Sequence, residues 1–152
     1  MQYITNSPEE TKRVAQALAS EITSYSTNKD HKGAGVVGFY GDLGAGKTTF
    51  IQYLAQAFGI KDSVVSPTFV IEKIYELGLA GRPFSHFIHI DAYRIEDSKE
   101  LISLGWEKII SKSDNLIFIE WPERVADIMP PHMKVMIDHI SENSRKIEVL
   151  KQ

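Results

Sequence analysis

The sequence predicts an α/β fold, and three patterns within its 152 residues support this prediction. An apolar run at 36–40 leads through a glycine-rich turn into an amphipathic helix that ends near Gly59. A second helical pattern at 8–25 precedes this unit, with apolar residues recurring on one face. Two pairs of β-like runs, at 70–93 and 133–150, flank turn residues and indicate antiparallel hairpins.

The first helix has a clear start signal. Ser7 can accept a capping hydrogen bond, Pro8 suits the first helical position, and Glu10 completes a capping box. Apolar residues then recur at helical spacing to about Tyr25, which is typical of a helix that packs on a core. The polar stretch 26–34 predicts a loop before the next strand.

The later part of the chain predicts short helices and one more buried strand. Asp97 can cap a short helix that Gly105 closes, and residues 106–113 predict another. The apolar run 116–119 predicts a buried strand that ends at Glu120. The four hairpin strands are expected at 70–77, 84–93, 133–140 and 145–150.

Composition limits the class of protein. The length fits a single domain over 1–152, and the formal net charge of −3 does not indicate a broad nucleic-acid surface. The sequence has no cysteine, which excludes disulfides, thiol catalysis and cysteine zinc sites. No apolar run reaches membrane length, and residues 1–6 lack a basic and apolar signal. We therefore expect a cytoplasmic protein without a membrane partner.

The stretch 41–48 matches the phosphate-binding pattern G-x-x-x-x-G-K-[ST] between a strand and a helix, a context that argues against a chance match on a turn. Its glycines permit positive φ and close backbone approach, so that free N–H groups at the helix start can bind phosphate. Lys47 supplies charge for the β- and γ-phosphates, and Thr48 supplies a hydroxyl for Mg²⁺. The expected nucleotide contacts are Gly41, Asp42, Leu43, Gly44, Ala45, Gly46, Lys47, Thr48 and Thr49.

Three acids are candidates for metal binding or for orienting water beside the phosphates. Glu120 ends a buried strand, the expected form of a Walker B metal acid, although an ordinary strand can also stop at a charge. Asp91 ends another apolar strand, so both acids can reach the same edge of the sheet. Because Glu120 matches the Walker B position, we expect it to lie nearer the metal. We expect Asp91 to bind the metal through water or to hold the attacking water. Asp42 either forms a turn or orients water at the γ-phosphate.

Other polar residues give weaker signals. The stretch Ser66-Pro67-Thr68-Phe69 is more typical of a turn than of a site. The five histidines show no metal-ligand spacing. His89 and His139 lie in predicted strands, where a structural role is the more common one.

Together, four motifs in this order resemble the TsaE family of small bacterial ATPases, which are required for making threonylcarbamoyladenosine in tRNA. The motifs are 41–49, Ser66-Pro67-Thr68-Phe69, His89-Ile90-Asp91-Ala92-Tyr93-Arg94 and Ile119-Glu120-Trp121-Pro122-Glu123. The resemblance extends over about 7–145. Two positions differ from the family pattern: Ala92 stands where leucine is usual, and Ser144 where glycine is frequent.

The resemblance implies a P-loop NTPase fold, a single three-layer domain with a mixed parallel and antiparallel central sheet. It implies ATP and Mg²⁺ as cofactors. From the residues themselves we expect Lys47, Asp42 and Asp91 to be catalytic and Thr48, Glu120 and Asp91 to lie around the metal. The resemblance also implies TsaB-like and TsaD-like partners. On this reading the TsaD-like protein carries out the transfer, and the chain hydrolyses ATP to support turnover and meets tRNA mainly through the complex.

Two other functions remain open from the sequence. A small-molecule kinase would fit the length and the loop, but kinases of this fold usually bring lid arginines to the transferred phosphate. The five arginines here are scattered, at 13, 82, 94, 124 and 145. A nucleotide switch without hydrolysis is the second alternative. No guanine-reading Asn/Thr-Lys-x-Asp motif is present, which favours ATP.

Overall fold

The structure is a computed structural model that describes residues 1–28, 30, 32–61, 64 and 70–152. Its strands are β1 (Gln2–Thr5), β2 (Gly35–Tyr40), β3 (Glu72–Glu76), β4 (His86–Asp91), β5 (Asn115–Glu120), β6 (Met133–His139) and β7 (Arg145–Leu150). Its α-helices are α1 (Pro8–Ser26), α2 (Lys47–Ala57), α3 (Lys99–Ser103) and α4 (Trp106–Ile110). Two 3-10 segments, η1 (Leu79–Gly81) and η2 (Pro122–Ile128), complete the described elements.

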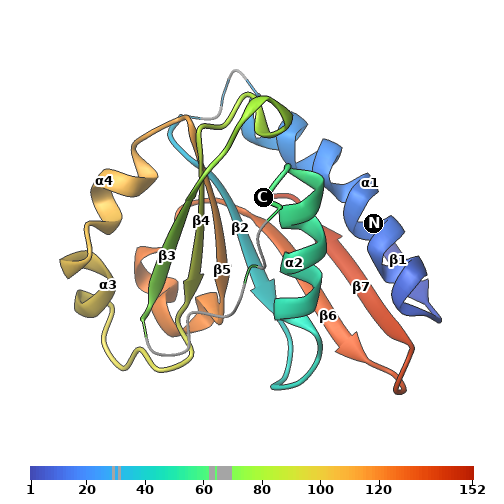
Figure 1. Cartoon of the computed structure of the whole chain (residues 1–152). Helices are drawn as coiled ribbons and strands as arrows, with labels where there is room; N and C mark the ends of the chain where they lie inside the picture. The colour runs from blue at the N-terminus through green and yellow to red at the C-terminus, as the bar shows by residue number, and fades with distance from the viewer. Residues whose placement is uncertain (29, 31, 62–63, 65–69) are drawn as a thin grey trace.

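Within the described residues, seven strands form one sheet in the order β1-β7-β6-β2-β5-β4-β3 (Figure 1). The central strand β2 runs parallel to β5 and β6, and β5 runs parallel to β4. The outer pairs β3–β4, β6–β7 and β1–β7 are antiparallel. The predicted α/β class with a mixed sheet is therefore confirmed, and both predicted hairpins are present.

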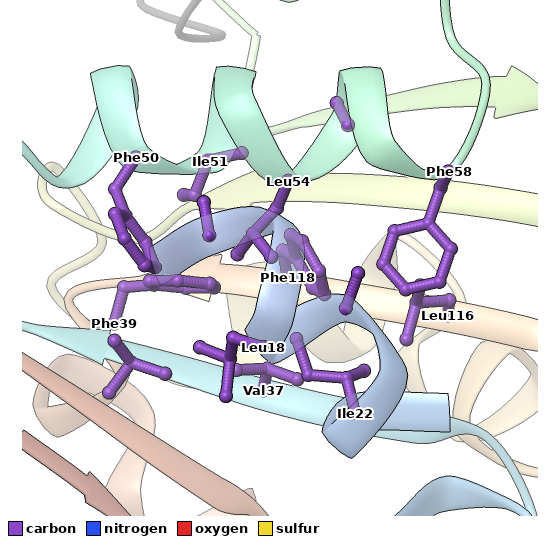
Figure 2. Close-up of a cluster of buried hydrophobic side chains, with 14 of the residues drawn as sticks. Leu18, Ile22, Val37, Phe39, Phe50, Ile51, Leu54, Phe58, Leu116 and Phe118 are labelled. Atoms are coloured by element: carbon purple, nitrogen blue, oxygen red, sulfur yellow. The ribbon is translucent and has the colours of Figure 1, made fainter. Parts of the chain in front are cut away.

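Helices cover both faces of the sheet and give three layers (Figure 1). Alternate residues of a strand point to opposite faces, so Phe118 packs beneath α2 while Ile117 packs toward α4 and η2. Figure 2 shows Phe50 and Leu54 of α2, and Phe58 directly after it, directed at the sheet. This packing fixes α2, and with it the loop that precedes α2, against the sheet.

The start of α1 follows the predicted capping box with one difference. The Ser7 hydroxyl accepts from the Glu10 N–H at 3.2 Å, as expected. The Glu10 carboxylate, however, accepts from the N–H of Asn6 at 2.7 Å rather than from Ser7. At the shorter helix α3, Asp97 accepts from the Lys99 N–H at 2.9 Å, although Ser98 occupies the cap position itself.

Three of the described elements, β1, η1 and η2, are absent from the sequence prediction. Strand β1 pairs antiparallel with β7, with Gln2 opposite Glu148, so its partner lies at the other end of the chain. Three of its four side chains are exposed or partly exposed, and no apolar alternation marks it as a strand. Segment η2 begins at Pro122, with Trp121 between it and the end of β5. Among the described residues, no helix is long and apolar enough to cross a membrane.

The sheet gathers the predicted site at one edge. The parallel strands β2, β4 and β5 end at the lower edge in Figure 1, beside the loop that joins β2 to α2. In the register between β4 and β5, Asp91 lies opposite Glu120. The two acids that the sequence marks as strand ends are therefore neighbours, next to the predicted phosphate loop.

Candidate functional site

The loop between β2 and α2 has the backbone that its glycines predict. Gly41, Gly44 and Gly46 have φ values of +146°, +81° and +104°, a region that residues with a Cβ rarely adopt. A Cβ on Gly41 would also overlap the carbonyl oxygen of Ile137. Gly46 is the cap residue of α2, and the first N–H groups of a helix have no partners within it. The loop therefore presents free donors at the start of α2.

Lys47 is folded back over this loop. Its ammonium donates to the carbonyl oxygen of Asp42 at 2.9 Å and to that of Gly41. It also lies 4.2 Å from the centre of the Trp121 ring. Burial lowers the pKa of Lys47 from its usual value, while nearby carboxylates, Glu120 first among them, oppose this shift. The charge is thus held inside the loop, where phosphate oxygens could replace the carbonyls.

A chain of hydrogen bonds joins α2 to β5 and β4. The Thr48 hydroxyl donates to Glu120 Oε1 at 2.9 Å. The other carboxylate oxygen, Oε2, accepts from His89 Nε2–H at 2.8 Å. Glu120 is 3% exposed and His89 is fully buried. The predicted hydroxyl and the predicted acid are therefore in direct contact.

Trp121 follows Glu120 in an unusual backbone conformation. Its φ and ψ are 57° and 47°, and among the described residues it is the one non-glycine with positive φ. A bulky residue in this region, directly before a proline, is strained by about 1–3 kcal/mol. The turn brings the indole against Lys47 and within 5.0 Å of the Tyr93 ring, measured between ring centres. The strained residue thus builds one wall of the site.

A cavity of about 580 Å³ lies beside the loop. It is lined by Leu43, Gly44, Gly46, Lys47, Thr48, Thr49, Val70, Ile71, Asp91, Tyr93, Arg94, Glu120, Trp121 and Arg145. Six of the nine predicted nucleotide contacts belong to this lining, and both predicted strand-end acids do as well. The other three, Gly41, Asp42 and Ala45, belong to the same loop without lining the cavity.

Two of the arginines that are scattered along the sequence lie at this cavity. Arg94 and Arg145 both belong to its lining. Arg145 donates from Nε to the carbonyl oxygen of Ala45 at 2.9 Å and from Nη1 to that of Ser141 at 2.6 Å. It thereby ties the β6–β7 hairpin to the phosphate loop, beside the turn where Ser144 departs from the family pattern. Arg94 is an exposed side chain.

The site residues fit a small hard cation together with phosphate. Within the part of the chain that the structure describes, no group of three or more His, Cys, Asp or Glu could hold a metal by itself. Mg²⁺ in phosphate-binding loops needs fewer ligands from the protein, because phosphate oxygens and waters complete its octahedral shell. One hydroxyl, Thr48, and one carboxylate, Glu120, both oxygen donors, are 2.9 Å apart at the loop. This donor set suits Mg²⁺.

Asp91 and Asp42 differ in their placement. Asp91 lines the cavity, and its Oδ1 accepts from the Tyr93 N–H at 3.0 Å. Asp42 is exposed, and its carbonyl oxygen accepts from the Ala45 N–H at 3.0 Å, so its backbone takes part in a turn. The motif Ser66-Pro67-Thr68-Phe69 lies outside the described residues.

Comparison with known proteins connects this site to a family. The profile of the family described as threonylcarbamoyl adenosine biosynthesis protein TsaE matches residues 5–147. The chain belongs to the TsaE family. A TsaE protein of Rickettsia felis is 33% identical over 151 residues, covering 97% of this chain and 78% of the relative. One of Bacillus subtilis is 32% identical over 148 residues, covering 97% and 83%.

A solved structure supports the same assignment. The crystal structure of YdiB from Bacillus subtilis superposes with a TM-score of 0.70 and 27% sequence identity, covering 97% of this chain and 82% of that one. The family resemblance read from the four sequence motifs is therefore confirmed, together with the P-loop fold. As a TsaE protein, the chain takes part in tRNA threonylcarbamoyladenosine biosynthesis.

Sequence reasoning missed two residues of the site. His89 was expected to be structural, yet it donates to the predicted metal acid. A signal was available, because strand alternation places His89 on the same face as Asp91, two residues further on. Trp121 had no independent signal, since its contact with Lys47 depends on the left-handed backbone after β5.

Proposed function

We propose that this TsaE protein binds ATP with Mg²⁺ in the cavity beside the phosphate loop and hydrolyses the nucleotide. The observation that carries the proposal is the convergence of Lys47, Thr48 and Glu120 on one cavity. Catalysis of ATP hydrolysis depends mainly on positioning the reactants and stabilising charge. The Lys47 ammonium, the free N–H groups of the loop and the two residues that would hold Mg²⁺ supply most of these requirements.

Phosphate binding would use groups that already lie inside the loop. The N–H groups at the start of α2 would donate to the phosphate oxygens. The Lys47 ammonium would exchange the Gly41 and Asp42 carbonyls for the β- and γ-phosphates. Because Trp121 covers this ammonium, its charge is shielded from water and acts more strongly on the phosphates.

Thr48 and Glu120 are the proposed holders of Mg²⁺, with Asp91 acting through water. When bound, Mg²⁺ neutralises negative charge on the phosphate oxygens. Thr48 would offer its hydroxyl oxygen, and Glu120 would accept from waters or ligate through Oε1. Asp91 stands opposite Glu120 in the sheet and is proposed to orient the attacking water.

The two acids can be separated by a magnesium titration. Glu120→Gln should raise the Mg²⁺ concentration at half-maximal ATPase activity and lower turnover, because the amide is a weaker ligand. Asp91→Asn should lower turnover with a smaller change in that midpoint. Phosphate release measured against Mg²⁺ in the presence of partner proteins gives both values. Glu123→Gln, an exposed acid three residues further on, is the matched control.

The outcome decides the assignment of both acids. A midpoint that moves only in Asp91→Asn would exchange the two roles. A midpoint that moves in neither variant would make both acids structural.

Asp42 is proposed to act on the attacking water or the γ-phosphate. Asp42→Asn should keep ATP affinity, because the loop turn uses the backbone carbonyl of Asp42, which the variant retains. Turnover in the partner complex should fall, because the carboxylate is lost. Nucleotide titration and phosphate release measure the two quantities separately. Unchanged turnover would show that Asp42 only forms the turn of the loop and does not act on the water or the phosphate.

The partners in this proposal are TsaB-like and TsaD-like proteins. The TsaD-like protein would carry out the threonylcarbamoyl transfer, and ATP hydrolysis by this chain would support turnover of the complex. The chain has a formal net charge of −3, which agrees with tRNA being bound mainly by the partners.

The experiment that tests the function compares the fate of the γ-phosphate. Labelled ATP is incubated with the chain and both partners, and with a panel of nucleosides and small alcohols. Release of phosphate to water supports the proposal. Label on an added alcohol would identify a small-molecule kinase, and tight binding without turnover in the full complex would identify a switch.

A further inference from the structure

His89 is a buried polar side chain that the family motifs leave without a role. It lies on β4, 0% exposed, between Phe87 and Asp91 on the face of the sheet that carries α2. Its ring centre is 6.4 Å from that of Phe87, and in the sheet it stands opposite Phe118. Two neighbours of the imidazole are therefore aromatic, while Lys73 of β3 stands opposite His89 on the other side in the sheet.

Packing alone does not account for an imidazole at this place. Nδ1 is buried without a hydrogen-bond partner among the described residues. A buried polar atom that lacks a partner costs about 1–3 kcal/mol, whereas an apolar side chain of similar size would avoid that cost. What the imidazole provides and leucine does not is the Nε2–H group, and this group contacts Glu120.

The Glu120 carboxylate is held from two sides. Oε2 accepts from His89 on β4 at 2.8 Å, and Oε1 accepts from Thr48 on α2 at 2.9 Å. A glutamate side chain has three rotatable bonds, so one contact would leave the carboxylate free to turn. Because His89 occupies Oε2, the oxygen that remains for Thr48 and for the metal is Oε1.

We propose that His89 is a positioning residue that orients the Glu120 carboxylate for Mg²⁺ by donating from Nε2–H to Oε2. The inference rests on the proposed function, because it assigns His89 to the metal acid of that site. His89 itself does not line the cavity. Partners of this kind, which hold a ligand in place, typically change metal affinity about 10–100-fold when they are removed.

The test uses nucleotide binding rather than turnover. The affinity for a fluorescent ATP analogue is measured against Mg²⁺ for the wild type, His89→Leu and His89→Gln, with thermal unfolding in parallel. His89→Leu removes the donor at similar volume and should raise the Mg²⁺ midpoint by about 10–100-fold. His89→Gln places an amide N–H near the position of Nε2 and should restore most of the affinity. Affinity without Mg²⁺ should stay unchanged in both variants.

A double-mutant comparison separates positioning from a general structural role. If His89 acts only through Glu120, then adding His89→Leu to Glu120→Gln should move the Mg²⁺ midpoint no further. Additive shifts would overturn the proposal, and so would a wild-type midpoint in His89→Leu while Glu120→Gln is shifted. If His89→Leu does not fold, His89→Phe, an aromatic side chain that also lacks a donor, decides by the same criteria.

The two proposals fail in different ways. Binding of the nucleotide by the wild type without any Mg²⁺ dependence would overturn the metal assignment and the role of His89 together. A Mg²⁺ dependence that is sensitive to Glu120→Gln but not to His89→Leu would overturn the role of His89 alone.

Discussion

Replacing Lys47 with alanine should reduce ATP affinity by about 100-fold or more, because a charged hydrogen bond is worth about 1.5–3 kcal/mol and the ammonium would make several to the phosphates. The lysine is 5% exposed and already lies against the carbonyls of Gly41 and Asp42, so its position is set before nucleotide arrives. Titration with a fluorescent ATP analogue measures the effect.

The other two cations of the lining are poor substitutes for Lys47. Nε and Nη1 of Arg145 are engaged with backbone carbonyls of the loop and the hairpin, and Arg94 is exposed. Arg94→Ala is therefore the matched control, since it removes one positive charge from the same cavity. Thermal unfolding separates a binding defect from a folding defect. Equal ATP affinity in the wild type and Lys47→Ala would contradict the phosphate-loop assignment.

The isolated chain should hydrolyse ATP slowly, and the partner complex should raise the rate by about 10³–10⁵, the range that an arginine supplied in trans can contribute. Among the described residues, the cationic side chains of the cavity lining are Lys47, Arg94 and Arg145. Lys47 is assigned to binding, and Arg145 is tied to the loop. The described lining therefore holds no arginine that is both firmly placed and uncommitted to the loop, as a stabiliser of the transition-state charge would have to be.

Phosphate release by the chain alone, with each partner and with both measures this stimulation. Arg94→Ala is tested in parallel, because Arg94 is the exposed cation of the lining. If the arginine comes from a partner, Arg94→Ala should keep most of the stimulated rate. If Arg94→Ala abolishes the stimulated rate, the arginine is supplied in cis. A fast rate from the isolated protein that partners leave unchanged would contradict the prediction.

Local sequence was sufficient for most elements of the fold. The Ser7 cap, the glycine positions of the loop and the hairpin strands all follow from residues within a few positions of one another. The boundaries differ modestly, as in the strand predicted at 84–93 and observed as His86–Asp91. Helix and strand periodicities and turn chemistry are local properties, so a local pattern can carry them.

By itself the sequence determined the phosphate loop, the Thr48 hydroxyl, the strand-end acids and the family. Only the tertiary structure decided that Asp91 and Glu120 stand opposite each other, because sheet register depends on contacts between strands far apart in the chain. It also placed His89 on the carboxylate and Trp121 over Lys47. These contacts join side chains from different elements. Strand alternation indicates which face His89 occupies, but only the packing of the whole sheet brings its ring to Glu120 and the indole to Lys47.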